Sequence, residues 1–192
     1  MNAASLYGLV LAGGASRRMG TDKAALQIDG VTQLERAVTL LERFVSDVYV
    51  SVRQSDSVRD VFNCIPDSVD TRGPAAGMLS AHLAHPESAW LVVACDMPLL
   101  GHDLLQELVT LRDPAAAATC WSGEGEQPEP LCAVYEPATL AAFLQSVRAG
   151  GNPSPRDWLA TCGAAIHAAP DARALRSANT PTEWQELING HD

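Results

Sequence analysis

The length, composition and charge of the chain set the first limits on its function. Its 192 residues fit one compact domain that can bury a core without metals or disulfides. Apolar residues make up 47% and charged residues 19%, proportions typical of a globular protein. The formal net charge of −10 excludes non-specific binding to nucleic acid or to an anionic membrane, because the long-range field would repel both. Any phosphate-binding site must therefore depend on a local cluster of positive charge.

The cysteines and the apolar segments indicate where the protein works. Five cysteines lie far apart and form no C-x-x-C pair, so we expect buried, reduced thiols. We find no basic segment followed by a long apolar one, and no apolar stretch of about 18 residues. These features predict a cytoplasmic protein.

The first half of the sequence alternates between strand and helix patterns. The predicted strands are residues 6–11, 47–52, 62–65 and 90–94. Apolar residues recur at helical spacing over residues 31–45, where Thr32 and Glu35 predict a capping box. Another helix is expected from residue 73 onward. This β-α-β alternation favours a parallel sheet.

The second half mixes helices, strands and loops. Helices are predicted over residues 104–111, 137–149 and from 181 onward, and strands over residues 116–121 and 131–135. Asp103 is expected to begin the first of these helices, and Thr180 with Glu183 to form a capping box on the last. Residues 152–156 are interpreted as a proline-rich loop. No linker or repeat interrupts the chain, so residues 1–192 are expected to form a single domain.

Residues 13–23 carry the most specific chemistry. Their glycines and cations are Gly13, Gly14, Arg17, Arg18 and Lys23. Glycines let backbone N–H groups approach phosphate oxygens, and the cations neutralise charge that the rest of the chain would repel. The segment predicts a polyanion cradle, although it lacks the G-x-x-x-x-G-K-S/T pattern of a Walker A loop. Lys23 is the only lysine in the chain; the alternative is a solvated surface lysine.

A longer pattern, L-A-G-G-x-S-x-R-M-G-x-D-K over residues 11–23, resembles the signature loop of the molybdenum cofactor guanylyltransferases, within the MobA-like nucleotidyltransferase family. Later segments similar to further family motifs are Asp67-Ser68 with residues 73–79, residues 95–98 and residues 179–181. The resemblance implies an α/β fold with three α/β/α layers and a Rossmann-like, mostly parallel sheet, similar to the nucleotide-diphospho-sugar transferases. It also implies a nucleotide-binding half, about residues 1–100, and an acceptor-binding half, about residues 101–192.

Nucleotidyl transfer depends on positioning and charge neutralisation more than on covalent chemistry by the protein. Mg²⁺ takes oxygen ligands and keeps several waters, so one carboxylate plus triphosphate oxygens can hold it. We expect Asp96, at the carboxyl end of a central strand, to be the metal ligand and a catalytic residue. The alternative role for Asp96 is a helix cap before Pro98.

The signature loop supplies the remaining catalytic and nucleotide-binding candidates. Arg17 and Arg18 would contact the β- and γ-phosphates, and Lys23 would neutralise the charge that develops as pyrophosphate leaves. The nucleotide-binding positions implied by the resemblance are Leu11, Ala12, Gly13, Gly14, Lys23, Asp67 and Asp96. Asp67 would accept hydrogen bonds from guanine or ribose; the alternative is a turn residue after Pro66.

Several positions bear on the choice of substrate. Ser51 stands where some family members carry an asparagine that contacts the nucleotide, and glutamates in residues 124–130 would repel an anionic acceptor. Arg156 is either a ligand for an acceptor phosphate or a solvated side chain. His82 and His85 share a helical face, for which a surface helix is favoured over a metal site.

The predicted reaction is guanylyl transfer, in which GTP and a molybdopterin-type molybdenum cofactor give the guanine dinucleotide and pyrophosphate. Molybdoenzyme apoproteins would be further partners, whereas nucleic acid and membrane are not expected. A cytidylyltransferase acting on the same cofactor, whose loop more often has Leu-Ala-Ala-Gly, remains an alternative. So do a MobA-like enzyme with another phosphate acceptor and, in a different class, a nucleotide-binding adaptor that delivers cofactor to an apoenzyme.

Overall fold

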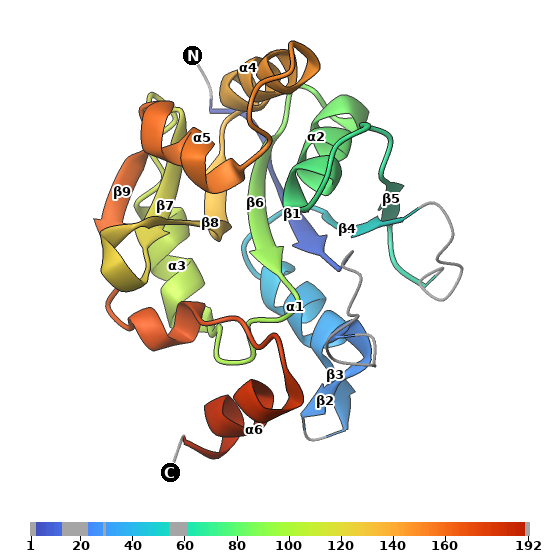
Figure 1. Cartoon of the computed structure of the whole chain (residues 1–192), viewed down its shortest axis with the longest axis vertical. Helices are drawn as coiled ribbons and strands as arrows, with labels where there is room; N and C mark the ends of the chain where they lie inside the picture. The colour runs from blue at the N-terminus through green and yellow to red at the C-terminus, as the bar shows by residue number, and fades with distance from the viewer. Residues whose placement is uncertain (1–2, 13–22, 29, 54–60, 191–192) are drawn as a thin grey trace.

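The chain folds around one main sheet with helices on both faces (Figure 1). The computed structural model describes residues 3–12, 23–28, 30–53 and 61–190, and only the backbone of Lys23 and Glu124. None of the helices within these ranges is long and apolar enough to cross a membrane.

The main sheet is mostly parallel. Its strands are β1 (Leu6–Leu11), β4 (Val48–Val52), β5 (Cys64–Pro66), β6 (Ala89–Ala94), β7 (Ala118–Ser122), β8 (Pro128–Tyr135) and β9 (Ala165–Ala168). They lie in the order β5-β4-β1-β6-β8-β7-β9. β8 runs antiparallel to both of its neighbours, and the other neighbouring pairs are parallel. The carboxyl ends of β1, β4, β5 and β6 therefore lie along the same edge of the sheet.

Helices cover the two faces of this sheet. They are α1 (Gln33–Leu41), α2 (Pro74–Ala84), α3 (His102–Thr110), α4 (Pro137–Arg148), α5 (Pro155–Thr161) and α6 (Pro181–Asn189). Shorter elements are the 3-10 turns η1 (Lys23–Ala25), η3 (Glu124–Glu126) and η4 (Ala172–Leu175), and the antiparallel pair β2 (Gln27–Ile28) and β3 (Val31–Thr32). One core lies between the sheet and α1 with α3, and the other between the sheet and α2, α4 and α5. The predicted three-layer architecture is confirmed.

The central strands supply side chains to both cores. Val10 and Val93 belong to the core under α1 and α3, whereas Leu9 and Val92 belong to the core under α2 and α4. Successive side chains of a strand point to opposite faces, so an unbroken apolar run is what a strand buried on both faces requires. Each such buried side chain contributes about 1.5–3 kcal/mol of transfer free energy. This burial holds the ends of β1 and β6 firmly side by side.

Local sequence signals account for several helix ends. At α1, the Glu35 N–H donates to Thr32 Oγ1 at 3.2 Å and the Thr32 N–H donates to Glu35 Oε2 at 2.9 Å, so the predicted capping box is confirmed. At α6, the Glu183 N–H donates to Thr180 Oγ1 at 3.2 Å. The Glu183 carboxylate, however, accepts from the Asn179 N–H at 2.7 Å, so only half of the predicted second box forms.

Three sequence predictions were wrong. Asp103 does not begin α3: the helix starts at His102 after Gly101, without a side-chain cap. The segment predicted as a proline-rich loop contains a helix start, because Ser154 caps α5 and Pro155 occupies its first turn, a position that proline favours. His82 is only 5% exposed, since α2 is apolar nearly all round and packs between the sheet and α4.

Candidate functional site

Two of the predicted carboxylates lie at the same edge of the sheet. Asp67 follows β5 and Asp96 follows β6, and both strands run parallel to β1 in the order β5-β4-β1-β6. The Cys95 N–H donates to the Leu11 carbonyl at 3.3 Å, which continues the β1–β6 pairing past the end of β6. Ligands of open α/β sheets bind at this carboxyl edge. Leu11, Ala12, Asp67 and Asp96 are therefore placed where a nucleotide site is expected.

The signature loop itself lies outside the described residues. This applies to Gly13, Gly14, Arg17 and Arg18, whose predicted contacts with phosphates are untested. Lys23 opens η1, and only its backbone is described. The roles assigned to these five residues remain predictions.

Ser51 orients Asp67. The Ser51 hydroxyl, on the fourth residue of β4, is 2% exposed and donates to Asp67 Oδ1 at 3.0 Å. The Asp67 N–H donates to the Val52 carbonyl at 2.9 Å. Burial raises the pKa of the Asp67 carboxyl, while the Ser51 bond and the Arg53 charge oppose that rise. Asp67 is thus a fixed, partly desolvated acceptor, a setting in which a hydrogen bond from a ligand is strengthened.

Gly77 lets α2 approach this carboxylate. A Cβ at position 77 would overlap the Ser51 hydroxyl and come within 2.9 Å of Leu11 Cδ2. Nearby, Ser80 Oγ accepts the N–H groups of Ser68 and Val69 at 2.8 and 3.3 Å. Gly77 and Ser80 together fix α2 against the segment that follows Asp67. The motif of residues 73–79 did not predict this role for Ser80, which lies just beyond it.

The third and fourth motifs meet at Asp96. The half-buried Asp96 lies between buried Cys95 and buried Met97, and its carbonyl accepts the Ala178 N–H at 2.9 Å. Ala178 immediately precedes the Asn179-Thr180-Pro181 segment at the start of α6. Residues 82 positions apart in the chain are therefore joined by a backbone hydrogen bond beside the predicted metal ligand.

A second carboxylate faces Asp96 from β8. Glu129 lies three residues before Cys132, which pairs with Val93 in the antiparallel register, and Asp96 lies three residues after Val93. Burial raises the pKa of Glu129, and the negative charge of Asp96 adds to that rise. The Leu131 N–H donates to Glu129 Oε1 at 3.0 Å, which partly offsets it. The two carboxylates create a negative potential that suits a divalent cation.

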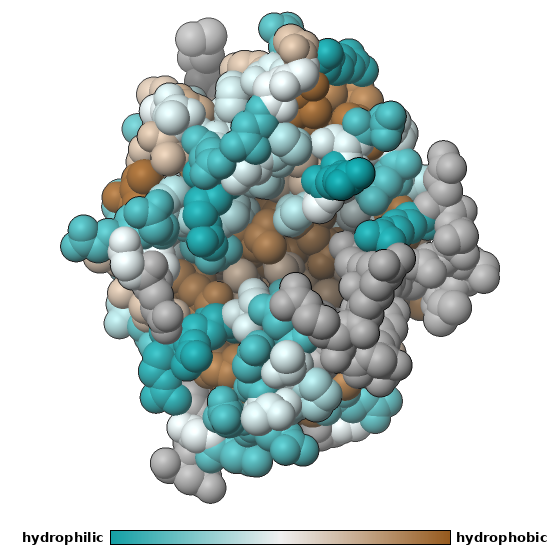
Figure 2. Space-filling model, viewed as in Figure 1, coloured by the Kyte–Doolittle hydropathy of each residue, from teal (hydrophilic) through white to brown (hydrophobic). Residues whose placement is uncertain are grey.

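A polar cavity of about 490 Å³ opens beside Glu129. Arg156 from α5 and Arg176 after η4 line it together with Asn179, and the Arg156 guanidinium donates to Glu129 Oε2 at 3.4 Å. Figure 2 shows this side of the molecule hollowed near its centre, over the ends of the central strands, with apolar side chains on the floor and hydrophilic ones around it. The two arginines in its lining make this cavity suited to an anionic ligand.

Comparison with known proteins identifies the family. A family model described as the MobA-like NTP transferase domain matches residues 8–169. This chain belongs to the MobA-like NTP transferase family. A molybdenum cofactor biosynthesis bifunctional protein of Synechocystis sp. is 34% identical over 149 residues, which are 76% of this chain and 43% of that longer protein. A probable molybdenum cofactor guanylyltransferase of Nostoc sp. is 31% identical over 186 residues, covering 93% of this chain and 88% of that protein.

Solved structures agree with this assignment at the level of the fold. The crystal structure of molybdopterin-guanine dinucleotide biosynthesis protein A from Archaeoglobus fulgidus matches with a TM-score of 0.77 and 22% identity, covering 95% of this chain and 97% of that one. Four separated segments of this chain carry the resemblance to the family. Within the described residues, the structure brings the last three of them to one edge of the sheet.

Proposed function

We propose that this MobA-like transferase moves GMP from GTP to a molybdopterin-type molybdenum cofactor and releases pyrophosphate. The observation that carries the proposal is the convergence of Asp67, Asp96 and the segment before α6 at the carboxyl edge of the sheet. A relative named as a probable guanylyltransferase covers most of the chain and supports the choice of reaction.

The reaction requires little covalent chemistry from the protein. An oxygen of the acceptor's phosphate attacks the α-phosphorus of GTP, the bond from that phosphorus to the bridging oxygen breaks, and pyrophosphate leaves with the electron pair. Mg²⁺ would neutralise the triphosphate and help to align it. The chain's own task is to hold both phosphates in line and to exclude competing water.

Asp96 fits the role of metal ligand. Its carboxylate stands at the end of a buried strand and close enough to Glu129 to raise that group's pKa. Among the described residues, no three histidine, cysteine or acidic side chains gather into a metal site. A magnesium ion at Asp96 would therefore complete its coordination with triphosphate oxygens and water, which is the usual arrangement for this ion.

The nucleotide and the acceptor would lie on opposite sides of Asp96. On the β4–β5 side, Asp67, oriented by Ser51, would accept hydrogen bonds from guanine or ribose. On the β8 side, the cavity with Arg156 and Arg176 would receive the phosphate of the cofactor. Lys23 and the loop arginines would cover the triphosphate between them. Cytoplasmic location and transfer of the product to a molybdoenzyme apoprotein complete the proposal.

Pyrophosphate release tests this assignment. The parent protein would be assayed with molybdopterin cofactor and Mg²⁺, comparing GTP, CTP and ATP, alongside Lys23→Ala and Asp96→Ala. Loss of one charge-stabilising group should lower turnover with GTP by about 100- to 1,000-fold. Arg148→Ala, which removes an exposed arginine from the far end of α4, is the matched control and should keep parental turnover.

Each alternative predicts a different result in the same assay. Preference for CTP would assign the chain to the cytidylyltransferases. Release of pyrophosphate only with a different phosphate acceptor would keep the enzyme class and change the substrate. No release with any nucleotide, together with intact nucleotide binding, would favour the adaptor.

A further inference from the structure

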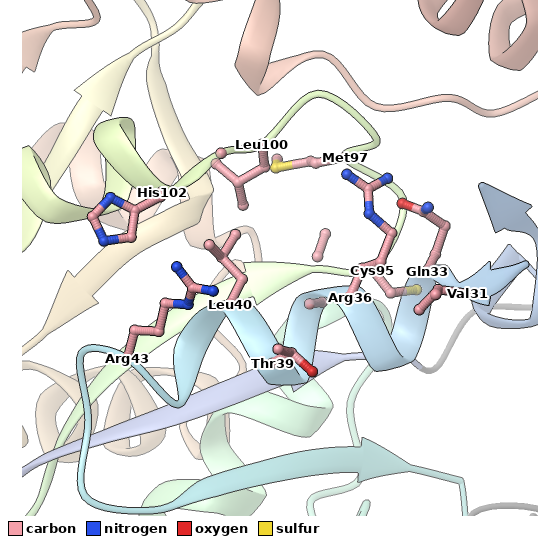
Figure 3. Close-up of a pocket in the computed structure, with 13 residues that line it drawn as sticks. Val31, Gln33, Arg36, Thr39, Leu40, Arg43, Cys95, Met97, Leu100 and His102 are labelled. Carbon is pink, nitrogen blue, oxygen red and sulfur yellow. The ribbon is translucent and has the colours of Figure 1, made fainter. Parts of the chain in front are cut away.

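A second groove lies on the other side of the segment that carries Asp96. It has a volume of about 490 Å³ and runs between α1 and residues 95–102 (Figure 3). Of the positions predicted to bind the nucleotide, those whose side chains the structure describes, Leu11, Ala12, Asp67 and Asp96, do not line it. Within the described part of the chain, the groove also shares no lining residue with the cavity beside Glu129.

The groove has an apolar floor and a cationic rim. Leu40 from α1 and Met97 and Leu100 from the opposite segment form much of the floor. The rim carries Arg36 from α1 and Arg43 from the turn after this helix, and Figure 3 shows Leu40 between them. Within the described part of the chain, no carboxylate lines the groove. A local patch of this sign in a protein of net charge −10 is suited to a negatively charged ligand.

A buried amide adds a polar group to the same groove. Gln33 lines the groove, is 3% exposed, and its Nε2 has no hydrogen-bond partner. A buried donor without a partner destabilises the free protein, so an acceptor atom of a ligand would be favoured there. Nearby, Arg36 Nη1 donates to the Pro98 carbonyl at 3.4 Å, a long bond that occupies one of its five donors. Gln33 and Arg36 thus retain unused donors at one end of the groove.

We propose that this groove binds an elongated organic anion with an apolar middle and a negative group at each end. Arg36 and Leu40 are four residues apart and share one face of α1, and Arg43 lies in the turn that follows the helix. Glu42, which caps α1, keeps a right-handed helical conformation, so a rise of about 1.5 Å per residue places the two arginines about 10 Å apart. One acidic group would bind Arg36 and the Gln33 amide, the other would bind Arg43, and the body would cover Leu40.

The size of the groove favours a small molecule over a folded partner. Pockets for small ligands typically enclose about 300–1,000 Å³ and combine an apolar lining with a few placed polar groups. The bound anion would contact Cys95 and Met97, the two neighbours of Asp96. Binding in the groove is therefore expected to change the environment of the Asp96 backbone amide.

A chain-length series provides the test. Calorimetry would compare butanedioate, decanedioate and dodecanedioate with the monoanion decanoate. We expect the long dianions to bind at least tenfold more tightly than decanoate, since they add a second charge-assisted contact. Butanedioate should bind weakly, because it cannot span both arginines. In NMR spectra, the Gln33 side-chain amide and the Asp96 backbone amide should shift on binding.

Variants assign the binding to this groove. Arg43→Gln, at an exposed position, and Arg36→Gln should each weaken decanedioate binding about tenfold, whereas Arg148→Gln on α4 should leave it unchanged. Gln33→Met should raise the melting temperature of the free protein, because it removes the unpartnered donor, and should weaken binding. A purely structural Gln33 would not produce these two opposite effects.

Three results would overturn the proposal. They are the absence of binding at every chain length, equal binding of decanoate and decanedioate, and binding that survives both arginine substitutions. Self-association that Arg43→Gln abolishes, without any binding of dianions, would instead assign the groove to a second copy of the chain. The binding measurements need no catalytic turnover, so they stand apart from the test of the proposed reaction.

Discussion

Replacing Gly77 by alanine should loosen the contact between α2 and the nucleotide edge of the sheet. The new Cβ would lie 2.8 Å from Ser51 Cβ and 2.9 Å from Leu11 Cδ2, atoms that belong to two different strands. Overpacking of a core costs about 1–3 kcal/mol, and alanine in a helix interior returns about 1 kcal/mol relative to glycine. Because two strands must move at once, we expect an overpacking cost at the upper end of this range, so the free energy of unfolding should fall by about 2 kcal/mol in total.

Thermal unfolding measures this effect. For a chain of this length, about 2 kcal/mol corresponds to a fall in Tm of about 4–8 °C. The loss should shrink in a Ser51→Gly background, where two of the overlapped atoms are gone. Gly123→Ala is the control, since its nearest atom lies at 3.8 Å and its φ is −86°. A Gly77→Ala variant at least as stable as the parent would refute the reasoning, because helix propensity alone predicts that outcome.

Three further predictions concern buried ionisable groups. Burial raises the pKa of the Asp67 carboxyl, so the contribution of this group to stability is complete at acid pH and is lost as pH rises through the raised pKa. Asp67→Asn should therefore raise Tm at neutral pH but not at acid pH. The same variant should bind GTP more weakly. Arg112→Met should lower the free energy of unfolding by about 3–5 kcal/mol, because it leaves the buried Glu136 carboxylate without the guanidinium that donates to it at 2.7 and 3.0 Å. Adding Glu136→Gln should recover part of this loss, and no recovery would contradict the pairing. Burial raises the pKa of Cys120 to about 12 and that of Cys132 further, so iodoacetamide at neutral pH should spare both until the protein unfolds, as peptide mass spectrometry would show.

The parallel part of the sheet could be predicted because its signals are local. Residues 6–11 and 90–94 are unbroken apolar runs, which suit strands buried on both faces. Thr32 and Glu35 are three residues apart, so the capping box they form is visible without knowledge of the fold. Asp96 could be predicted for the same reason, since it lies two residues beyond such a strand, whereas the prediction for Asp67 came from the resemblance of its segment to a family motif.

The features that could not be predicted from the sequence depend on contacts between distant segments. The insertion of β8 between β6 and β7 is decided by tertiary pairing, and with it the approach of Glu129 to Asp96. β9 has only four residues and none is buried, so its sequence carries little periodicity. In the sequence, Ser51 is only a departure from the family pattern, and its hydrogen bond to Asp67 becomes visible only in the fold. The groove beside α1 draws its walls from segments about 60 residues apart, and no local motif marks it.

The most direct test of the central claim is the mass of the product formed from GTP and molybdopterin cofactor in the presence of Mg²⁺. The account predicts a molybdopterin guanine dinucleotide, formed together with one pyrophosphate per molecule and absent when Asp96→Ala replaces the parent. Recovery of unchanged cofactor and GTP, or of an adduct with another nucleotide in a competition among GTP, CTP and ATP, would contradict it.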